Sequence, residues 1–598
     1  MEGCPAEGVS YRKKAGFAGK SNFTQGGITA MKRALAILLA AAMAVSVAGC
    51  SGSESSSSQA STGGSSSAGT SSASQAAPSE SGSGSDETVS KVYEWPLVSE
   101  PTELTVFTKL LPQVEDFDTN KTTQWYEEKT GVHINWIQVP SADFTTQLNL
   151  SYASDDWPDV YACELSTDQL LMMRNGGVIE PLDDLLDNYA YWANQIFKDH
   201  PEYKDYLTAP DGHIYSLWYN DTGKHMYSTY KMFVKQAWLD KLGIKSPTTT
   251  AEFEEMLKAF RDQDMNGNGD TTDEIPYMSS MNAWGGSPFY YLVYPFQLQS
   301  IRGVYKDDSG AWQLAGVQDG YRDAMAWIHS LFEQGLIAEE TFTQDKAQFK
   351  SLLNVGSEAE TVIGCFTAAY QGEVIDSTAA TLPNDYQVVE PLTGPTGIKQ
   401  AATNGYGEFK PRTTITTACK NPKVAMQWLD FWLSKEGRVI QEYGVEEGVD
   451  YEMINQKSIY GDEKSYNRLF NLAALQNVVW YNHTTPRHDW EDIRYGAAAE
   501  DGSLDTLLYE AALVYEPYHV LTGIPALSWN EDEGEAEEFS TLKAEIDEYV
   551  KSNSAAFAIG RRSLDEWDAY VKEIENMNLS RYLELVAKTY DGSKVDYK

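Results

Sequence analysis

The fold of this chain is decided by residues 104–139, which read LTVFTKLLPQVEDFDTNKTTQWYEEKTGVHINWIQV. The first four residues predict a buried strand, and residues 120–129 predict a helix closed by Gly131. Residues 133–139 are rich in β-branched and aromatic side chains and predict a second strand. Strand, helix and strand in this order predict a parallel sheet with helices packed against it.

The same alternation continues along the chain. Residues 143–154 predict another helix, residues 160–163 a third strand, and residues 361–366 a later buried strand. Later helices are predicted from apolar stripes at helical spacing over residues 253–260, 321–332, 424–432 and 564–574. The first of these follows Thr249 and Glu252, which predict a capping box. These features predict an α/β protein, and its length predicts two large lobes instead of one core.

The N-terminal region predicts export. Met31-Lys32-Arg33 is a short basic segment, and residues 34–47 form an uncharged apolar run that is too short for a stable membrane span. Small residues then lead into Cys50, a pattern that resembles the lipobox of bacterial lipoproteins. The resemblance implies that Cys50 is diacylated and that residues 1–49, an upstream extension and a signal peptide, are removed. The alternative is a plain secretory signal with an incidental cysteine.

Residues 50–95 are predicted to be a tether. Of the 35 residues from Ser51 to Ser85, 17 are serine and very few are apolar, so the segment cannot bury enough surface to fold. Lipid chains on Cys50 would then hold the folded part, residues 96–598, close to a membrane.

The charge of the chain excludes some partners. The net charge is −41, and no basic patch offsets it, which argues against nucleic acid and against docking on anionic lipid. The membrane is therefore expected to be contacted only through the lipid anchor. Cys163, Cys365 and Cys419 are too few to form a disulfide framework, and we expect them to be buried thiols.

Residues 264–274 carry the most specific local motif. Oxygen-bearing side chains at alternate positions, with glycine at the sixth, suit a hard cation such as Ca²⁺. The predicted ligand set is Asp264, Asn266, Asn268, Asp270, Asp273 and Glu274. The closing acid stands at position 10 or 11 and not at the twelfth position of an EF-hand, so either Asp273 or Glu274 could close the shell. We expect a weak, structural calcium site, and the alternative is a turn without metal.

Together these residues resemble family 1 extracellular solute-binding proteins, especially the large lipoproteins of the oligosaccharide and alginate-binding type. The resemblance covers roughly residues 100–590. Besides the cation loop, it rests on residues 157–160, 392–395, 419–422, 444–451 and 557–560. An extra residue between Asp270 and Asp273 departs from the pattern of the family.

The resemblance implies a two-lobed periplasmic-binding-protein (flytrap) fold, type II-like, with extra C-terminal helices. Lobe 1 is expected from about residues 100–215 and 345–400, and lobe 2 from about residues 216–344 and 401–598. A solute, expected to be an oligosaccharide, would bind between the lobes, and the permease subunits of an ABC importer would recognise the closed form. We expect a monomer.

A carbohydrate site needs aromatic platforms and polar groups that bond to hydroxyls. The candidates in loop-like segments are Trp218, Trp284, Tyr370, Trp480, Arg487 and Trp529. Any one of them is more often a packing residue than a ligand contact.

Two other classes of function stay open. A cell-surface carbohydrate-active hydrolase is one alternative, although the sequence contains no metalloprotease, nucleophile-elbow, P-loop or dinucleotide motif. Among the scattered histidines, only His483 and His488 are close to each other, and we expect no catalytic residues. A ligand sensor for a membrane kinase would share the binding fold.

Overall fold

The computed structural model describes residues 93–154, 156–376, 379–380, 382–403, 408–472, 474–481, 484–500, 503–530 and 532–591. Contacts group residues 84–598 into one compact unit, apart from residues 1–83. Cys50, the signal peptide and the serine-rich segment lie outside the described residues, so the predictions made for them stay predictions.

The first lobe is built on a five-stranded sheet with the strand order β2-β1-β3-β12-β4. Its strands are β1 (Thr102–Leu110), β2 (Val132–Pro140), β3 (Val160–Ala162), β4 (Leu217–Asp221) and β12 (Glu408–Ile415). β1 pairs in parallel with β2 and β3, whereas β12 runs antiparallel to β3 and β4. The parallel pairing predicted from residues 104–139 is confirmed, with Leu104 opposite Ile134.

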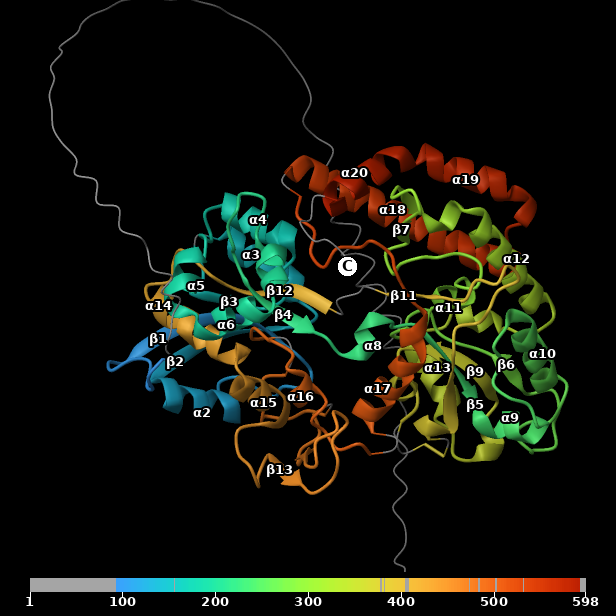
Figure 1. Cartoon of the computed structure of the whole chain (residues 1–598), viewed down its shortest axis with the longest axis horizontal. Helices are drawn as coiled ribbons and strands as arrows, with labels where there is room; N and C mark the ends of the chain where they lie inside the picture. The colour runs from blue at the N-terminus through green and yellow to red at the C-terminus, as the bar shows by residue number, and fades with distance from the viewer. Residues whose placement is uncertain are drawn as a thin grey trace, which may run out of the picture. The chain divides into compact units, whose positions relative to one another are not determined.

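Helices cover both faces of this sheet because side chains alternate along each strand. Val106 points into a core built with helices α2, α5, α6 and α14, whereas Phe107 points into a core built with α3 and α4 (Figure 1). The first-lobe helices are α2 (Lys121–Thr130), α3 (Phe144–Ala153), α4 (Thr167–Asn175), α5 (Asp183–Tyr189), α6 (Tyr191–Asp199), α7 (Pro201–Leu207), α14 (Pro422–Asp430), α15 (Lys435–Tyr443) and α16 (Glu491–Arg494). A hairpin of β13 (Tyr451–Ile454) and β14 (Ser465–Arg468) extends from α15.

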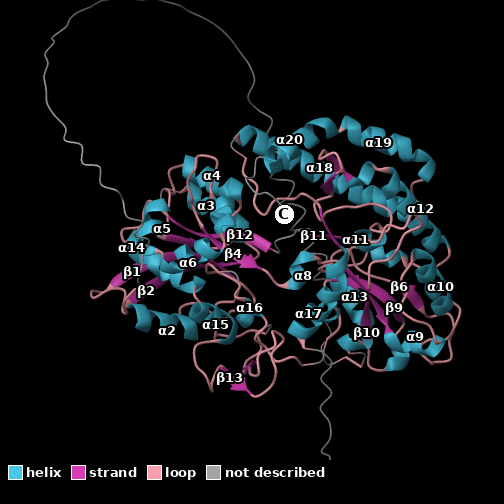
Figure 2. Ribbon diagram, viewed as in Figure 1, coloured by secondary structure: helices cyan, strands magenta, loops and turns pink. Residues whose placement is uncertain are grey.

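The second lobe is built on a four-stranded sheet with the order β10-β5-β9-β6. Its strands are β5 (Lys231–Lys235), β6 (Ile275–Tyr277), β9 (Ile363–Ala368) and β10 (Tyr386–Val389), and the predicted strand at residues 361–366 is β9. The helices of this lobe are α9 (Gln236–Leu242), α10 (Thr250–Arg261), α11 (Phe289–Leu292), α12 (Asp319–Glu333), α13 (Lys346–Leu353), α17 (Leu504–Tyr515), α18 (Glu533–Ala558), α19 (Trp567–Asn576) and α20 (Leu579–Asp591). Figure 2 shows the two separate sheets in magenta with helices around each.

The predicted lobe boundaries are wrong in two segments. Residues 345–400 are predicted for lobe 1, but β9 and β10 pair with β5 in the second sheet. Residues 401–598 are predicted for lobe 2, but β12 and α14 belong to the first lobe. The last helices do lie on the second lobe, where α18 packs against α12 (Figure 1, red). The predicted two-lobed α/β fold with extra C-terminal helices is confirmed.

The chain passes between the lobes at several places. The first passage runs from β4 through α8 (Lys224–Tyr227) into β5. A two-stranded parallel ribbon of β11 (Ala401–Thr403) and β15 (His519–Leu521) lies beside later passages. Residues 522–530, here called the strap, leave β15, contribute Ala526 and Leu527 to the core of the first lobe, and lead back to α18.

Local sequence explains the helix starts. The hydroxyl of Thr249 accepts the amide N–H of Glu252 at 3.1 Å and caps α10, as predicted. The carboxylate of Glu252 accepts the amide of Thr248 and not that of Thr249, so the reciprocal half of the predicted box is shifted by one residue. Pro422 opens α14, where the missing N–H of proline costs nothing.

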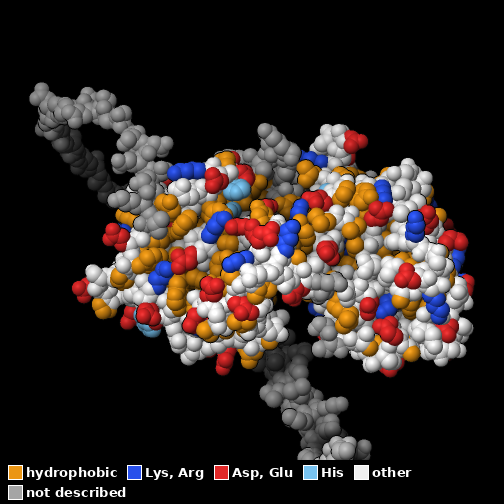
Figure 3. All heavy atoms as spheres, turned by 60° about the horizontal axis from the view of Figure 1, so that its bottom comes forward, with side chains coloured by type: hydrophobic (Ala, Val, Ile, Leu, Met, Phe, Trp, Pro, Cys, Tyr) orange, Lys and Arg blue, Asp and Glu red, His pale blue; other side chains and the backbone are white. Residues whose placement is uncertain are grey.

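The distribution of charged side chains and of cysteines agrees with what the sequence predicts. On the face shown in Figure 3, basic side chains are interspersed among acidic ones. Cys163 and Cys365 are buried and Cys419 is half-buried, and all three are free thiols. No helix within the described ranges is both long and apolar enough to cross a bilayer.

Candidate functional site

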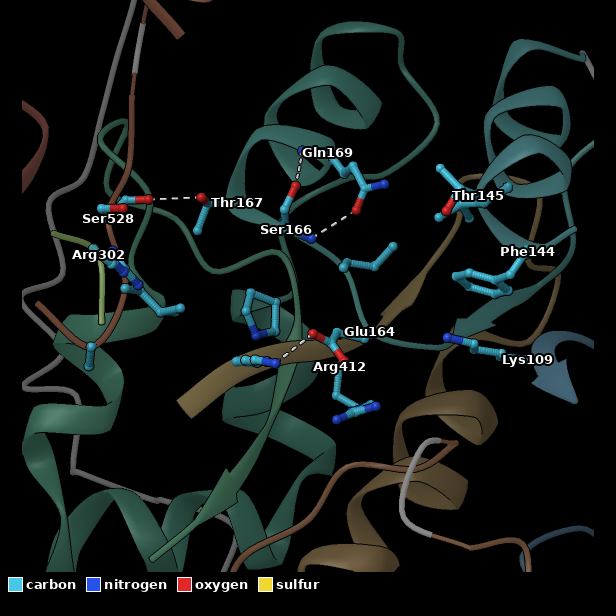
Figure 4. A pocket seen from close by; sticks show the side chains of 16 residues that line it. Lys109, Phe144, Thr145, Glu164, Ser166, Thr167, Gln169, Arg302, Arg412 and Ser528 are labelled. Carbon is cyan, nitrogen blue, oxygen red and sulfur yellow. Dashed lines mark hydrogen bonds and ion pairs between the residues drawn. The ribbon is translucent and has the colours of Figure 1, made fainter. Parts of the chain in front are cut away.

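A pocket of about 460 Å³ lies at the edge of the first sheet that faces the passages between lobes. We call it the edge pocket. Its first-lobe wall comes from the end of β1, the start of α3, the loop from β3 to α4, and β12. The strap and Arg302 of the second lobe complete it (Figure 4). The lining residues are Lys109, Phe144, Thr145, Leu148, Glu164, Leu165, Ser166, Thr167, Gln169, Arg302, Lys410, Pro411, Arg412, Ala526, Leu527 and Ser528.

Polar side chains of the edge pocket are held by one another. The ammonium of Lys410 lies 2.7 Å from the carboxylate of Glu164 and also bonds to Glu408. Ser166 caps α4 by accepting the amide of Gln169, whose side chain accepts the amide of Ser166 in return. These contacts fix the polar groups before any solute arrives, which reduces the ordering cost of binding.

Arg412 is the most deeply placed charged group of the edge pocket. Its side chain is 1 % exposed, and its guanidinium lies 4.4 Å from the ring centroid of Tyr219. Burial lowers the pKa of Arg412, because a charged guanidinium is poorly solvated there. Its Nε and Nη1 atoms have no hydrogen-bond acceptor among the described residues.

A second pocket, of about 240 Å³, lies in the second lobe and shares Arg302 with the edge pocket. We call it the tyrosine pocket, because Tyr230, Tyr290 and Tyr321 line it. The rings of Tyr230 and Tyr290 lie 4.2 Å apart. A polar pocket and an aromatic pocket therefore adjoin at one arginine.

Two predicted ligand residues come together on the second lobe. Trp284 is 39 % exposed, and its ring lies 6.2 Å from Tyr370 and 6.0 Å from His225 of α8. The amide of Trp284 donates to Glu373 at 3.2 Å. An exposed indole beside a second ring, next to the first passage between lobes, is suited to stack on a flat solute.

Trp218 and Trp480 are not on an accessible surface. Trp218 is fully buried in β4, and Trp480 is 4 % exposed with its ring 4.7 Å from that of Trp432. The indole N–H of Trp480 donates to Thr123 at 2.7 Å. Both belong to the first-lobe core, so the hypothesis that they are platforms is contradicted by their burial.

Arg487 and Trp529 are held in structural contacts. The guanidinium of Arg487 is buried 2.7 Å from Asp489 and 3.9 Å from Asp221, at the end of β4. Trp529 of the strap donates its indole N–H to the carbonyl of Tyr206 at 3.0 Å. Arg487 therefore neutralises carboxylates near the passage between lobes, and Trp529 fixes the strap to the first lobe.

The histidine pair gives no support for catalysis. His483 lies outside the described residues, and His488 is buried beside His200, with ring centroids 5.4 Å apart. Burial lowers the pKa of His488 to about 3, so its ring is neutral at physiological pH.

The predicted cation loop is folded as a series of tight turns. Asp264 accepts the amides of Gly267 at 2.6 Å and Gly269 at 3.1 Å, and both glycines have a positive φ. Asn266, Asn268 and Asp270 each accept the amide of the residue two positions later. Because of these contacts, the side-chain oxygens of the motif face the backbone of the loop.

The carboxylates at the end of the loop test whether a cation fits. Glu274 is 8 % exposed and accepts the amide of Met265 with one oxygen, while its Oε2 has no donor. Oδ1 of Asp273 is also buried without a donor among the described residues. Buried carboxylate oxygens without donors fit a hard cation. The loop does not supply three or more clustered Asp, Glu, His or Cys side chains, and no such group occurs elsewhere in the described part of the chain.

The sequence prediction missed the edge pocket almost entirely. The capping pair Ser166 and Gln169 was a usable signal for the start of α4. β12 carries Glu408, Lys410 and Arg412 beside threonines, so no apolar alternation marks it as a strand.

Comparison with known proteins places this geometry in a family. Residues 110–439 match the family model for bacterial extracellular solute-binding proteins. The fructooligosaccharide ABC transporter substrate-binding protein FusA of Streptococcus pneumoniae is 29 % identical over 78 % of this chain and 86 % of FusA. An EF-hand mutant of FusA in complex with fructo-nystose shares 25 % identity and a TM-score of 0.67, covering 82 % of this chain and 99 % of that chain. Lipoprotein LipO of Bacillus subtilis is 21 % identical over 94 % of this chain and 99 % of its own length.

The family match spans more than half of the chain, and it includes every strand of the second sheet and all strands of the first sheet except β1. The prediction that the chain is not an enzyme agrees with the nature of these relatives, which are substrate-binding proteins. The chain therefore belongs to the bacterial extracellular solute-binding proteins and is a binding protein, not an enzyme.

Proposed function

We propose that this chain captures a carbohydrate, specifically an oligosaccharide, between its lobes and delivers it to the permease of an ABC importer. The observation that carries the proposal is the edge pocket, to which both lobes contribute side chains. FusA supports the solute class, because it is named for fructooligosaccharides and an ABC transporter.

The chemistry of the two adjoining pockets suits a sugar. Hydroxyl groups need both donors and acceptors, which Glu164, Ser166 and Gln169 supply in the edge pocket. Apolar C–H faces need flat rings, which Tyr230 and Tyr290 supply in the tyrosine pocket. An extended saccharide would contact both lobes and so favour the closed form.

Trp284 and Tyr370 keep their predicted role as a platform in this proposal, because they are paired and partly exposed. Trp284→Ala should weaken binding by roughly 1–3 kcal/mol, the scale for burying a large side chain. Tyr460→Ala is a matched control, because Tyr460 is a 52 % exposed aromatic residue that is not part of the Trp284–Tyr370 ring pair.

Titration calorimetry against an oligosaccharide panel that includes fructo-nystose tests the proposal. We expect one solute per protein monomer, and the solute should be recovered intact after hours with the purified protein. Turnover that is abolished by replacing one carboxylate would contradict a binding role, and so would the absence of binding to every saccharide.

We also propose that Cys50 is lipidated and anchors the protein on the outer side of the cell membrane. The lipobox-like residues before Cys50 support this, as does the similarity to the lipoprotein LipO. Cys50→Ala should release the protein into the medium or leave an unprocessed precursor. A mutant that is fully processed and still membrane-bound would contradict the anchor.

The loop at residues 264–274 is proposed to bind Ca²⁺ as a structural ion. Glu274 and Asp273 each offer a buried oxygen without a donor, and Asp264, Asn266, Asn268 and Asp270 supply the remaining candidate oxygens. The EF-hand named for FusA supports the site. When bound, the ion would hold the loop together by neutralising its carboxylates.

A further inference from the structure

The edge pocket differs in charge from the chain that contains it. The chain has a net charge of −41, yet four basic residues and a single acidic residue, Glu164, line the pocket. The basic residues are Lys109, Arg302, Lys410 and Arg412. Lys410 is neutralised by Glu164 and Glu408. The charges of Lys109 and Arg412 are therefore the candidates for contact with a solute.

Lys109 and Arg412 have no carboxylate within ion-pair distance in the described part of the chain. The ammonium of Lys109 lies 5.2 Å from the ring centroid of Phe144. Figure 4 shows these two side chains next to each other. Arg412 is 1 % exposed, and two of its nitrogen atoms have no acceptor among the described residues. A buried guanidinium with free donors is costly unless a negative charge lies close to it.

The start of α4 adds a third positive element. Thr167 and Asp168 are the first two residues of this nine-residue helix. Their backbone amides therefore have no hydrogen-bond acceptor within the helix. Ser166, Thr167 and Gln169 lie at this helix start on the wall of the pocket (Figure 4). The carboxylate of Asp168 lines a different pocket, with Leu171 and Met172. The positive end of a helix favours anions.

We propose that the edge pocket is an anion subsite, and that the saccharide captured by this protein carries a carboxylate or sulfate group bound near Lys109, Arg412 and the start of α4. This inference rests on the proposed carbohydrate function. It narrows the solute to acidic saccharides, such as uronate or sulfated oligosaccharides. The shared chemistry is a compact oxyanion, which ammonium, guanidinium and helix amides all bind through charge-assisted hydrogen bonds.

The experiment compares saccharides that differ only in charge. Calorimetry on the purified protein would use trigalacturonate and its neutral methyl ester, and a sulfated galactose trisaccharide and its desulfated parent. We expect at least one acid to bind about 10-fold to 100-fold more tightly than its neutral partner, the ratio of one charge-assisted hydrogen bond. This preference should shrink as salt rises. The two acid arms distinguish a carboxylate from a sulfate.

Single substitutions test which residues cause the preference for acidic over neutral saccharides. Lys109→Gln should remove most of it. Lys572→Gln, which removes the charge of an exposed lysine outside both pockets, is the matched control and should keep the preference. Arg412→Gln should act like Lys109→Gln, and Arg412→Lys should restore part of the preference. Since Arg412 is buried and its variants can unfold, the partly exposed Lys109 carries the test independently.

Three outcomes would overturn the proposal. Neutral saccharides that bind as tightly as both acids would overturn the anion subsite and leave the carbohydrate function in place. Equal loss of preference in Lys572→Gln and Lys109→Gln would overturn the assignment to Lys109 and Arg412. If no saccharide of either charge binds, the proposed function itself fails.

Discussion

At the scale of single residues, position within the lobe decides what an aromatic side chain does. Trp480 lies among other indole rings, 4.7 Å from Trp432 and 5.8 Å from Trp428. Trp284 instead exposes 39 % of its surface beside Tyr370. The same residue type therefore stabilises the first lobe at one position and is available to a solute at the other.

Trp480→Ala should lower the free energy of unfolding by about 3–5 kcal/mol, the usual cost of removing a buried tryptophan. Denaturant unfolding at constant calcium measures this loss. Tyr460→Ala, which removes an exposed ring, should stay within about 0.5 kcal/mol of the parent protein. A Trp480→Ala variant that is as stable as the parent protein but no longer binds solute would contradict this assignment and show that Trp480 is a binding residue.

Glu442 makes the stability of the first lobe sensitive to acid. Burial alone would raise its pKa, but the guanidinium groups of Arg438, at 2.9 Å, and Arg468, at 2.6 Å, outweigh burial and lower the pKa to about 2. The unfolded chain binds a proton near pH 4.5 and the folded protein does so only near pH 2, so stability falls as pH decreases between these values.

Urea unfolding between pH 6 and pH 2.5 measures this effect. The parent protein should lose about 2–3 kcal/mol of stability through Glu442, and the Glu442→Gln variant should lose correspondingly less over the same range. The comparison separates Glu442 from other carboxyls that titrate there. Parallel pH curves for the two proteins would contradict the assignment.

At the scale of elements, the turn between β4 and α8 is tightly packed. A Cβ atom added at Gly223 would lie 2.6 Å from the ring of His225 and 2.8 Å from the carboxylate of Asp221. Gly223→Ala should therefore displace one of these side chains and lower stability by about 1–3 kcal/mol. Thermal unfolding measures the loss. Gly356→Ala is the control, because its nearest neighbour would be 3.7 Å away. Equal stability of the two variants would contradict the packing argument.

The cation loop joins α10 to β6, so its ion should stabilise the second lobe. Chelation should lower the melting temperature of the purified protein, and the difference should grow with calcium concentration, because the ion binds only the folded loop. Asp264→Ala should reproduce the shift and remove the response to chelator. Asp308→Ala replaces an acidic residue outside the loop and should keep the response. A parent protein whose melting temperature ignores calcium would contradict the site.

The elements of the fold were largely predictable, whereas their pairing was not. Residues 104–139 predicted β1, α2 and β2, because local apolar patterns specify strands and helices. β9 pairs with β5, which lies far from it in the sequence. The local sequence of residues 361–366 predicts a strand, but it does not predict which of the two sheets that strand joins. The same limit applies to Arg412, whose place in the edge pocket depends on residues from five other segments.

The solute residues illustrate this limit at single positions. Trp284 and Trp480 both occur in loop-like sequence, so residue type and local context could not separate an exposed ring from a buried one. The cation loop was easier to find, because all its candidate ligands lie within eleven consecutive residues, from Asp264 to Glu274.

At the scale of the whole molecule, the lobes are linked by charge as well as by chain. Arg494 of α16 lies 3.4 Å from Asp505 of α17, and Lys224 of α8 lies 2.7 Å from Glu516. The first pair joins a helix of the first lobe to a helix of the second lobe, and the second pair joins the first passage to the second lobe. The relative motion of the lobes would be concentrated at these places.

Solute binding should compact the molecule. Small-angle scattering of the purified protein should show a smaller radius of gyration with a bound saccharide than without it, because the saccharide contacts both lobes. The Trp284→Ala variant should need more saccharide for the same change, and Tyr460→Ala should match the parent protein. Saturated binding with an unchanged radius would contradict closure of the lobes.

The strap has a consequence for the order in which the protein can fold. The core of the first lobe contains Leu104 near its beginning and Ala526 and Leu527 near the end of the chain. During synthesis the first lobe therefore stays incomplete until almost the entire polypeptide has been made. Contacts between such distant segments slow folding. A first lobe that is completed so late leaves the polypeptide unfolded while it is being synthesised. This would suit export, because an exported polypeptide crosses the membrane before it folds.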